Sequence, residues 1–176
     1  MSLSKPVAST LPTKKKTKEW DHRRSCRDIR IFSDCEGIGS IIQASCLMQR
    51  RASARIKWSQ VGHSELDDKV RAIWHENYHE LPEVQGVQIW KSCIGRDMKQ
   101  VAECDFYCNG FPCIHISPQG KRDADTNSET EDLIFAIVQF LSAKKPRAWM
   151  VENVPNLSRQ FVVLLKTLVE AVHLAC

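Results

Sequence analysis

Residues 28–40, DIRIFSDCEGIGS, decide the fold. The stretch from Asp28 to Cys35 is a short run rich in apolar side chains, which is typical of a buried strand, and Glu36-Gly37-Ile38-Gly39-Ser40 is typical of a glycine turn. Helical spacing begins directly afterwards, over residues 41–51. A strand, a glycine turn and a helix in this order indicate the first unit of an α/β fold.

Strand-like and helix-like segments alternate through the rest of the chain. We expect strands over residues 55–63, 87–90, 104–108 and 148–151, helices over 67–79, over 131–143 and from Ser158 onward, and a polar loop over 118–130. This alternation predicts a parallel sheet that helices cover on both faces. Ligands of such sheets bind at the carboxyl ends of the strands, and the most distinctive motifs of the chain fall there.

Composition describes a globular domain preceded by a basic arm. The chain has 176 residues, enough for one domain with a real core, and 43% of them are apolar. The first 28 residues hold eight lysines and arginines against three acidic residues, without apolar periodicity, so we expect residues 1–27 to be a flexible arm. Such arms contact phosphates, act as nuclear addresses, or are simply solvated. The expectation of a nuclear protein depends on this arm alone, and a bacterial source would make the protein cytoplasmic.

The sequence argues against two other classes of protein. No apolar stretch reaches the length of a membrane span, and no signal peptide follows the early lysines, so we expect no membrane association. The eight cysteines form neither a CxxC pair nor a dense secreted framework, so we expect reduced thiols.

Three strand ends carry side chains suited to a nucleotide-like ligand. The turn Gly37-Ile38-Gly39 lets the backbone approach a ligand closely, although an ordinary strand-to-helix turn looks the same. Glu65 could accept both ribose hydroxyls, or it could belong to the capping stretch of the next helix. Asp97 could accept from an adenine amino group. Each residue taken singly leaves both interpretations open.

Two further strand ends carry side chains suited to catalysis. Cys113, in Gly110-Phe111-Pro112-Cys113, is a candidate nucleophile if a nearby charge lowers its pKa, and a buried structural cysteine is the alternative. Glu152 follows the apolar run 148–151, where partial desolvation would raise its pKa enough to donate a proton. An acid that caps the next helix is the alternative for Glu152.

The motifs together resemble one family. The segments FSDCEGIGS, SELD, GRDM, CNGFPC, GKRDAD and VENVPNL have the order and approximate spacing of the cytosine-C5 DNA methyltransferases, and GFPC and ENV are the most specific of them. The resemblance runs from about Ile29 to Leu157. It implies a Rossmann-like sheet of the S-adenosylmethionine-dependent methyltransferase type, incomplete at its C-terminal edge. It also implies that residues 28–176 are the N-terminal, cofactor-binding part of a catalytic domain.

The same resemblance assigns roles around the cofactor S-adenosylmethionine. Gly37 and Gly39 would cradle it, Glu65 would hold its ribose, and Asp97 its adenine. The other residues placed at the cofactor by resemblance are Phe32, Ile38, Leu66, Met98, Gly110, Pro112 and Leu133.

The resemblance also implies the reaction and its substrate. Cys113 would attack C6 of cytosine while Glu152 hydrogen-bonds the ring N3 and the exocyclic amine, which makes C5 nucleophilic enough to take the methyl group. In duplex DNA the cytosine must first be flipped out of the stack. Further contacts to the substrate would come from Ser117, Lys121, Arg122 and Asn153. DNA is the expected partner, and RNA stays open because a tRNA-methylating branch shares these motifs; neither the target sequence nor the oligomeric state is predicted.

Several features depart from the family pattern. Ile114 stands where glutamine is usual, Ser40 where a further glycine is common, and the stretch from Gly39 to Glu65 is longer than the norm. The Gln-x-Arg strand, the target-recognition domain and the C-terminal Gly-Asn segment of the family do not follow Glu152. We therefore expect the fifth strand to be an exposed edge and this polypeptide alone to show weak or absent activity.

Two other functions remain as alternatives. One is a cofactor- or nucleic-acid-binding remnant that keeps the fold without turnover. The other is a zinc peptidase, because residues 75–79, HENYH, match the HExxH pattern in a helical context. A third zinc ligand would discriminate, and only the remote Glu103 is available for that role. The spacing of Cys104, Cys108 and Cys113 does not predict a metal site.

Overall fold

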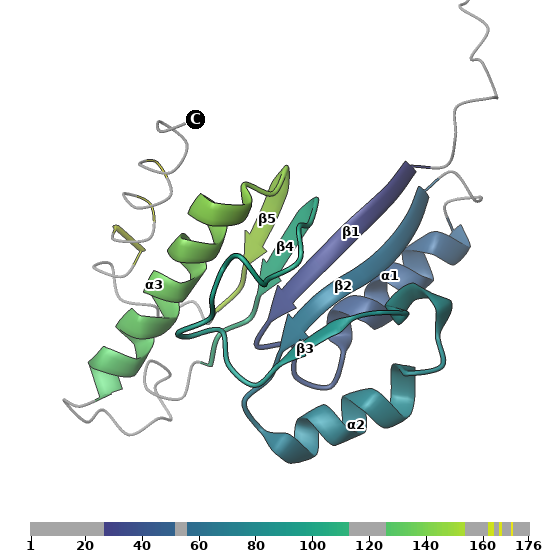
Figure 1. The fold of residues 1–176 in the computed structure, drawn as a ribbon, viewed down its shortest axis with the longest axis horizontal. Coiled ribbons are helices and arrows are strands. Elements are labelled where there is room, and N and C mark those ends of the chain that lie inside the picture. The colour runs from purple at the N-terminus through teal and green to yellow at the C-terminus, as the bar shows by residue number, and fades with distance from the viewer. Residues whose placement is uncertain are drawn as a thin grey trace, which may run out of the picture.

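A five-stranded parallel sheet forms the centre of the protein (Figure 1). The computed structural model describes residues 27–51, 56–112 and 126–153 and the single positions 162, 163, 166 and 170. The strands lie in the order β3-β2-β1-β4-β5. Along the chain the elements are β1 (Arg27–Asp34), α1 (Ser40–Arg51), β2 (Ile56–Ser64), α2 (Asp68–Tyr78), the 3-10 helix η1 (Pro82–Val84), β3 (Gln88–Trp90), β4 (Phe106–Asn109), α3 (Thr126–Lys144) and β5 (Ala148–Val151).

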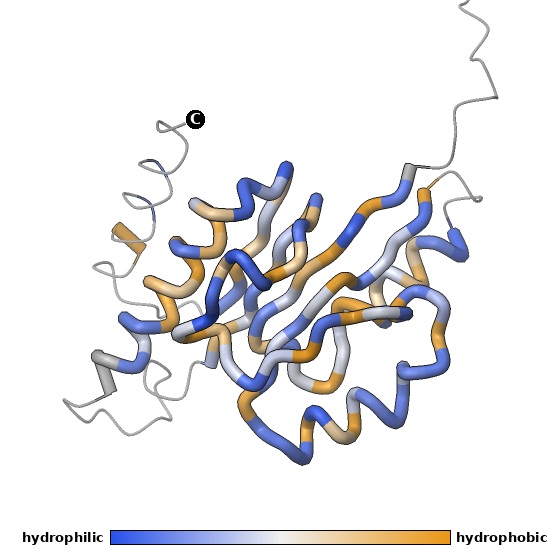
Figure 2. Tube along the Cα trace, in the orientation of Figure 1, coloured by the Kyte–Doolittle hydropathy of each residue, from blue (hydrophilic) through white to orange (hydrophobic). Residues whose placement is uncertain are grey.

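The strand order creates a switch point between β1 and β4. From β1 the chain first adds β2 and β3 on one side, and it then crosses back to add β4 and β5 on the other. Because crossovers between parallel strands are right-handed, this reversal places α1 and α2 on one face of the sheet and α3 on the other. Figure 2 shows apolar residues recurring along α2 and α3 between hydrophilic ones, as helices that cover a sheet require. Open α/β sheets bind ligands at such a switch point.

Aromatic rings fill the core beneath α3. The ring centroids of Tyr107 and Phe140 are 4.2 Å apart, and those of Phe32 and Phe140 are 4.9 Å apart. All three side chains are fully buried. Gly62 on β2 leaves the room that Phe32 needs, since a Cβ there would lie 2.3 Å from the ring of Phe32. Burial of each such side chain stabilises the fold by about 1.5–3 kcal/mol.

A second, smaller core lies under α1 and α2. Ile42 from α1 and Trp74 from α2 are buried there together with Val84. The ring of His63 stacks on Trp74 at 4.1 Å, and burial lowers the pKa of His63 to about 4. The sheet is therefore covered on both faces, as the sequence predicts.

The expected elements are present, with one clear error. The strand over 148–151 has the bounds that the sequence predicts, and the others differ by one or two residues at most of their ends. The loop expected over 118–130 is wrong at its end, because α3 already begins at Thr126. Its first turn is polar, and polar residues at a helix start look like loop when the sequence is read alone. Residues 1–26, and with them nearly all of the predicted arm, lie outside the described residues.

The C-terminal part of the sheet fits the expectation of an open edge. Within the described residues β5 pairs with β4 alone. Val162, Val163, Lys166 and Glu170 are helical, and the rest of the helix expected from Ser158 onward lies outside the described residues. No helix in the described ranges is long and apolar enough to cross a bilayer.

Candidate active site

A cavity of about 490 Å³ opens at the carboxyl ends of β1, β2 and β4. One wall is made by strand ends, including Cys35 and Ser64, and another by the loop residues 91–94 that follow β3. The start of α3 supplies Glu129 and Thr130. Of the residues that the sequence predicts at the cofactor, the cavity brings together Glu65, Leu66, Gly110, Pro112 and Leu133.

The glycine turn is hydrogen-bonded to Glu65, the residue that the sequence predicts to bind the ribose. The backbone N–H of Gly37 donates to Oε2 of Glu65 at 2.9 Å, and the N–H of Asp67 donates to Oε1 at 3.0 Å. Each carboxylate oxygen keeps acceptor capacity for a further donor, such as a ribose hydroxyl. Gly37 has φ +63°, and nothing lies within 4 Å of where its Cβ would be. The turn and the Glu65 carboxylate therefore form one hydrogen-bonded unit at the carboxyl ends of the strands.

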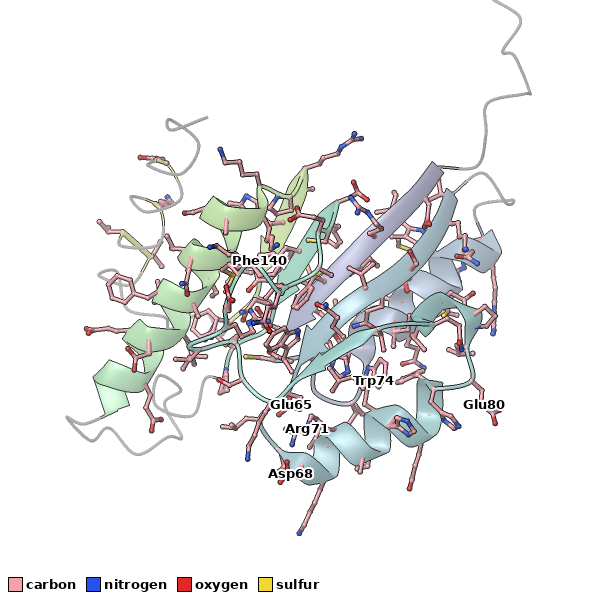
Figure 3. The ribbon with its side chains drawn as sticks, in the orientation of Figure 1. Glu65, Asp68, Arg71, Trp74, Glu80 and Phe140 are labelled. Atoms are coloured by element: carbon pink, nitrogen blue, oxygen red, sulfur yellow. The ribbon has the colours of Figure 1, made fainter. Side chains whose placement is uncertain are left out.

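Arg71 holds the segment that carries Glu65. Its guanidinium donates to the carbonyl oxygens of Glu65 and, at 2.9 Å, Leu66, and it pairs with Asp68. Figure 3 shows Glu65, Asp68 and Arg71 gathered at the start of α2. The N-cap of α2 is Asp67, which accepts from the N–H of Lys69 at 2.8 Å. The capping role left open for the stretch around Glu65 therefore belongs to Asp67, and Glu65 faces the cavity.

Gly39 serves packing rather than ligand approach. Its φ is +97°, and a Cβ would lie 2.2 Å from Cε2 of Tyr78 and 3.0 Å from Cδ1 of Trp74. Neither atom belongs to the cavity wall. Glycine is therefore required at the two positions of the turn for different physical reasons, although the sequence pattern does not distinguish them.

Glu36, between Cys35 and Gly37, is a buried carboxyl group. Burial raises its pKa to about 7, partly offset by a hydrogen bond from the Ser33 hydroxyl. Gln60 Nε2 in turn donates a hydrogen bond to Ser33 Oγ at 2.8 Å. An acid with a pKa near neutrality therefore lies inside the turn that the cofactor would approach.

A buried polar network that the sequence did not reveal lies directly beneath the cavity. Asp34, at the end of β1, accepts from Ser64 Oγ at 2.7 Å, from Tyr107 Oη at 2.8 Å, and from both Nη atoms of Arg96 at 2.8 and 2.6 Å. Asn109 Nδ2 donates to Tyr107 Oη at 3.0 Å. Burial raises the pKa of Tyr107 well above its usual value, and the nearby Asp34 carboxylate raises it further. The network joins the ends of three neighbouring strands to the loop after β3.

The Pro-Cys loop and the tip of β5 touch each other. Asn153 Nδ2 donates to the carbonyl oxygen of Phe111 at 2.9 Å, and the N–H of Glu152 donates to the carbonyl oxygen of Asn109 at 2.9 Å. Oε2 of Glu152 lies 3.8 Å from where a Cβ on Gly110 would be. The two motifs that the sequence singles out for catalysis are therefore neighbours. Cys113 itself lies outside the described residues, as do Ser117, Lys121 and Arg122.

One expectation about Glu152 is wrong. The sequence predicts a partly desolvated carboxylate, and the side chain is exposed. Glu152 lies just beyond Val151, the last residue of an edge strand, so the apolar run before it does not enclose it.

Besides Gly37 and Gly39, four residues predicted at the cofactor do not line the cavity. Phe32 is in the aromatic core, and Met98 packs against that core. Ile38 is 57% exposed on the turn. Asp97 is exposed and accepts from the N–H of Lys99 at 3.0 Å and from Gln100 Nε2 at 3.2 Å. The structure thus gathers part of the predicted cofactor set at the cavity, and Asp97, the residue predicted to bind adenine, does not line it.

The described cysteines are free thiols, as expected. Burial raises the pKa of Cys104 and of Cys108 to about 12. A hydrogen bond with Cys93, together with burial, raises the pKa of Cys35 in the cavity wall. Thiols with raised pKa values are poor nucleophiles at neutral pH, so none of these three replaces Cys113 as the candidate.

The HExxH residues do not assemble a metal site. The rings of His75 and His79 stack at 4.7 Å, and His79 Nδ1 contacts the carbonyl oxygen of His75 at 2.8 Å. Glu103, the remote third ligand, instead binds Lys144 Nζ at 2.9 Å. In the part of the chain that the structure describes, no cluster of three or more ligands suits a metal ion. The zinc-peptidase alternative therefore has no support.

Solved structures identify the class of fold. A protein of Listeria monocytogenes, described as a class I S-adenosylmethionine-dependent methyltransferase, matches with a TM-score of 0.57 over 84% of this chain and 46% of its own, at 10% identity. The transcriptional regulator Gal80p of Kluyveromyces lactis matches with a TM-score of 0.53 over 83% and 31%, at 13% identity. At these identities the likeness shows the fold alone. The sheet is the Rossmann-like sheet that S-adenosylmethionine-dependent methyltransferases use.

Sequence comparison identifies the family. The family model for C-5 cytosine-specific DNA methylases matches residues 32–172, so the chain belongs to that family. Type II methyltransferase M.NgoBI of Neisseria gonorrhoeae is 29% identical over 149 residues, 81% of this chain and 40% of its own length. M.SsoII of Shigella sonnei is 30% identical over 112 residues, 61% of this chain and 27% of its own. The chain thus spans less than half the length of these curated relatives.

Proposed function

We propose that this chain binds S-adenosylmethionine in the cavity at the strand ends and takes part in methyl transfer to C5 of cytosine in DNA. One observation carries the proposal. Asn153 of the Glu-Asn strand tip hydrogen-bonds Phe111 of the Pro-Cys loop, and Pro112 of that loop lines the cavity that holds Glu65. Donor pocket, nucleophile loop and acidic strand tip are therefore contiguous.

The residues present fit the donor. Both oxygens of Glu65 are fixed by backbone N–H groups and can still accept from ribose hydroxyls, and Gly37 leaves open space beside them. Leu66 and Leu133 offer apolar surface on the cavity wall. When bound, S-adenosylmethionine supplies an electrophilic methyl group. The chain fixes its position and orientation relative to the Pro-Cys loop.

The chain's own residues would activate the cytosine. The Cys113 thiolate forms a bond to C6, and the carboxyl group of Glu152 gives a proton to the ring N3, which takes up the displaced electron pair. C5 then has the electron density to take the methyl group, which leaves S-adenosylhomocysteine. A base removes the C5 proton, and the electron pair of that C–H bond expels Cys113 as a thiolate and restores the ring. The exposure of Glu152 leaves its carboxylate accessible to a flipped base. Ser117, Lys121 and Arg122 remain proposed contacts to the nucleic acid.

Covalent capture tests the catalytic part of the proposal. Duplex DNA that contains 5-fluorocytosine, mixed with the protein and S-adenosylmethionine, should give a denaturation-resistant adduct. Cys113→Ser should abolish the adduct and Glu152→Gln should slow its formation. Cys108→Ser, a change at a buried thiol on β4, is the matched control and should leave capture intact. An adduct that survives Cys113→Ser would overturn the assignment of the nucleophile.

The binding-module alternative predicts a different outcome of the same experiment. Such a module would bind S-adenosylhomocysteine in calorimetry without capturing cytosine. A tRNA substrate carrying 5-fluorocytidine in a parallel arm distinguishes RNA from DNA as the captured partner.

A further inference from the structure

Arg96 reaches from the loop after β3 through the core to the end of β1. Its two Nη atoms donate to the two carboxylate oxygens of Asp34, and the two side chains are 2% and 0% exposed. On the way the guanidinium lies 5.2 Å from the centroid of the Phe32 ring. A bidentate pair of this kind fixes direction as well as distance, because the planar fork of arginine matches the carboxylate.

The pair connects two walls of the cofactor cavity. On the strand side, Cys35 follows Asp34 directly, and Ser64, which also donates to Asp34, is itself part of the wall. On the loop side, residues 91–94 line the cavity just before Arg96. The distance between these walls is therefore set by the bond between Arg96 and Asp34.

Stability alone does not account for the pair. Replacement of a buried ion pair by apolar groups is often neutral or stabilising, because desolvation offsets the attraction. In addition, Nε of Arg96 is buried without a hydrogen-bond partner among the described residues, which is a further cost. What the pair supplies is a single, defined position for the loop.

We propose that Arg96 is a positioning residue for the adenosyl donor. By binding Asp34 it holds residues 91–94 in place in the cavity wall, and so it sets the affinity of the cavity. It also fixes the backbone at Asp97, which follows it directly, is exposed outside the wall, and is the acceptor that the sequence predicts for the adenine amino group. The proposal rests on the proposed function, because the donor is the ligand that the cavity would hold.

The test removes both charges together, so that no unpaired buried charge remains. The variant Asp34→Asn/Arg96→Met keeps an acceptor for Ser64 and Tyr107 and loses only the tether. The matched control is Asp105→Asn/Arg30→Met, which removes the same pair of charges at the opposite end of the sheet. Calorimetry measures binding of S-adenosylhomocysteine and of its inosine analogue, and thermal unfolding checks that each variant is folded.

We expect the Asp34/Arg96 variant to bind S-adenosylhomocysteine about tenfold or more weakly and to lose much of its preference for adenine over hypoxanthine. The control should bind like the wild type. A folded Asp34/Arg96 variant with wild-type affinity and preference would overturn the inference alone. If that variant does not fold, Arg96→Lys keeps the charge without the fork, and wild-type binding by it would likewise overturn the inference. A wild-type protein that binds neither ligand would overturn the proposed function, and the inference with it.

Discussion

The two ends of the sheet carry the same kind of ion pair in opposite surroundings. At the carboxyl end, Arg96 and Asp34 are 2% and 0% exposed, and three further polar side chains complete their network. At the amino end, Arg30 Nε lies 3.1 Å from Asp105, and these side chains are 46% and 24% exposed. Each end also has a cavity, of about 490 Å³ at the carboxyl end and about 580 Å³ at the amino end.

The difference shows at which end of the sheet the polar groups are buried and held in fixed positions. The amino-end cavity is lined by Asp28, Trp58 and Arg147 among others, and its charged groups are solvated surface residues. The carboxyl-end cavity instead sits on a desolvated network that fixes its walls. Cavity size alone would favour the amino end. Burial of the polar groups, together with the switch point between β1 and β4, supports the carboxyl end as the proposed site.

The largest contrast should appear when one arginine of each pair is removed. Arg96→Met leaves the Asp34 carboxylate buried without its charge partner, and we expect a loss of about 3–5 kcal/mol in the free energy of unfolding. Arg30→Met should cost less than about 1 kcal/mol, because an exposed pair contributes little. Urea denaturation of both variants measures this. Equal losses would contradict the comparison between the two ends.

Glu36 at the carboxyl end and Asp105 at the amino end should make the free energy of unfolding depend on pH in opposite directions. Burial raises the pKa of Glu36 from 4.5 to about 7, so its contribution to stability is present below pH 4.5 and is lost as the pH rises to about 7. The Arg30 side chain lowers the pKa of Asp105 below 3.8, so that contribution is present above pH 3.8 and is lost in more acidic solution.

Glu36→Gln should therefore match the wild type near pH 4 and exceed it at pH 8 by an amount on the order of 3 kcal/mol. Asp105→Asn should lower stability at pH 8, with a gap that closes in acid. Unfolding free energies measured from about pH 2 to pH 8 decide both, because the Asp105 contribution is lost only below pH 3.8. His63, whose lowered pKa of about 4 removes stability as the pH falls below 6.5, acts in all these proteins and cancels in the differences. A Glu36→Gln difference that does not change with pH would contradict the burial argument.

Local sequence patterns predict most of the elements. The strand, glycine turn and helix over residues 28–51 could be recognised because periodicity and glycine placement are local properties of the chain. The same holds for β5, whose apolar run follows Pro146. The start of α3 was missed because its first turn is polar. The family, likewise, could be recognised from short motifs in their order.

The supports of the site could not be predicted in this way. Asp34 and Arg96 are 62 positions apart, and Tyr107 is 73 positions from Asp34, so no local pattern joins them. Gly39 looked like a ligand contact because the clash with Tyr78 exists only after α2 has packed. Glu152 looked desolvated because an apolar run precedes it, and a sequence does not show how far neighbouring side chains enclose a strand end. Sequence patterns therefore predict the groups that would contact a ligand more readily than the groups that hold them in place.

The two glycines of the turn offer a smaller test within the carboxyl end. Gly39→Ala should cost about 2–3 kcal/mol, because left-handed strain adds to the overlap with Tyr78. Gly37→Ala should cost about 1–2 kcal/mol from its φ of +63° alone, since its Cβ meets nothing. Gly37→Ala should weaken the binding of S-adenosylhomocysteine more than it lowers the free energy of unfolding. The assignment of Gly39 to packing and of Gly37 to cofactor binding would be wrong if Gly37→Ala proved the more destabilising change. It would also be wrong if only Gly39→Ala weakened the binding of S-adenosylhomocysteine.

The smallest effect is expected at the amino end. Arg147 is 76% exposed, and its Nε lies 4.0 Å from Asp105, so Arg147→Ala should change the free energy of unfolding by less than about 0.5 kcal/mol. Because Arg147 lines the amino-end cavity, the same variant asks whether that cavity takes the cofactor. Unchanged calorimetric affinity for S-adenosylhomocysteine is the expected result. A weakened affinity would mean that the donor binds at the larger, solvated cavity, and the contrast between the two ends of the sheet would then no longer locate the site.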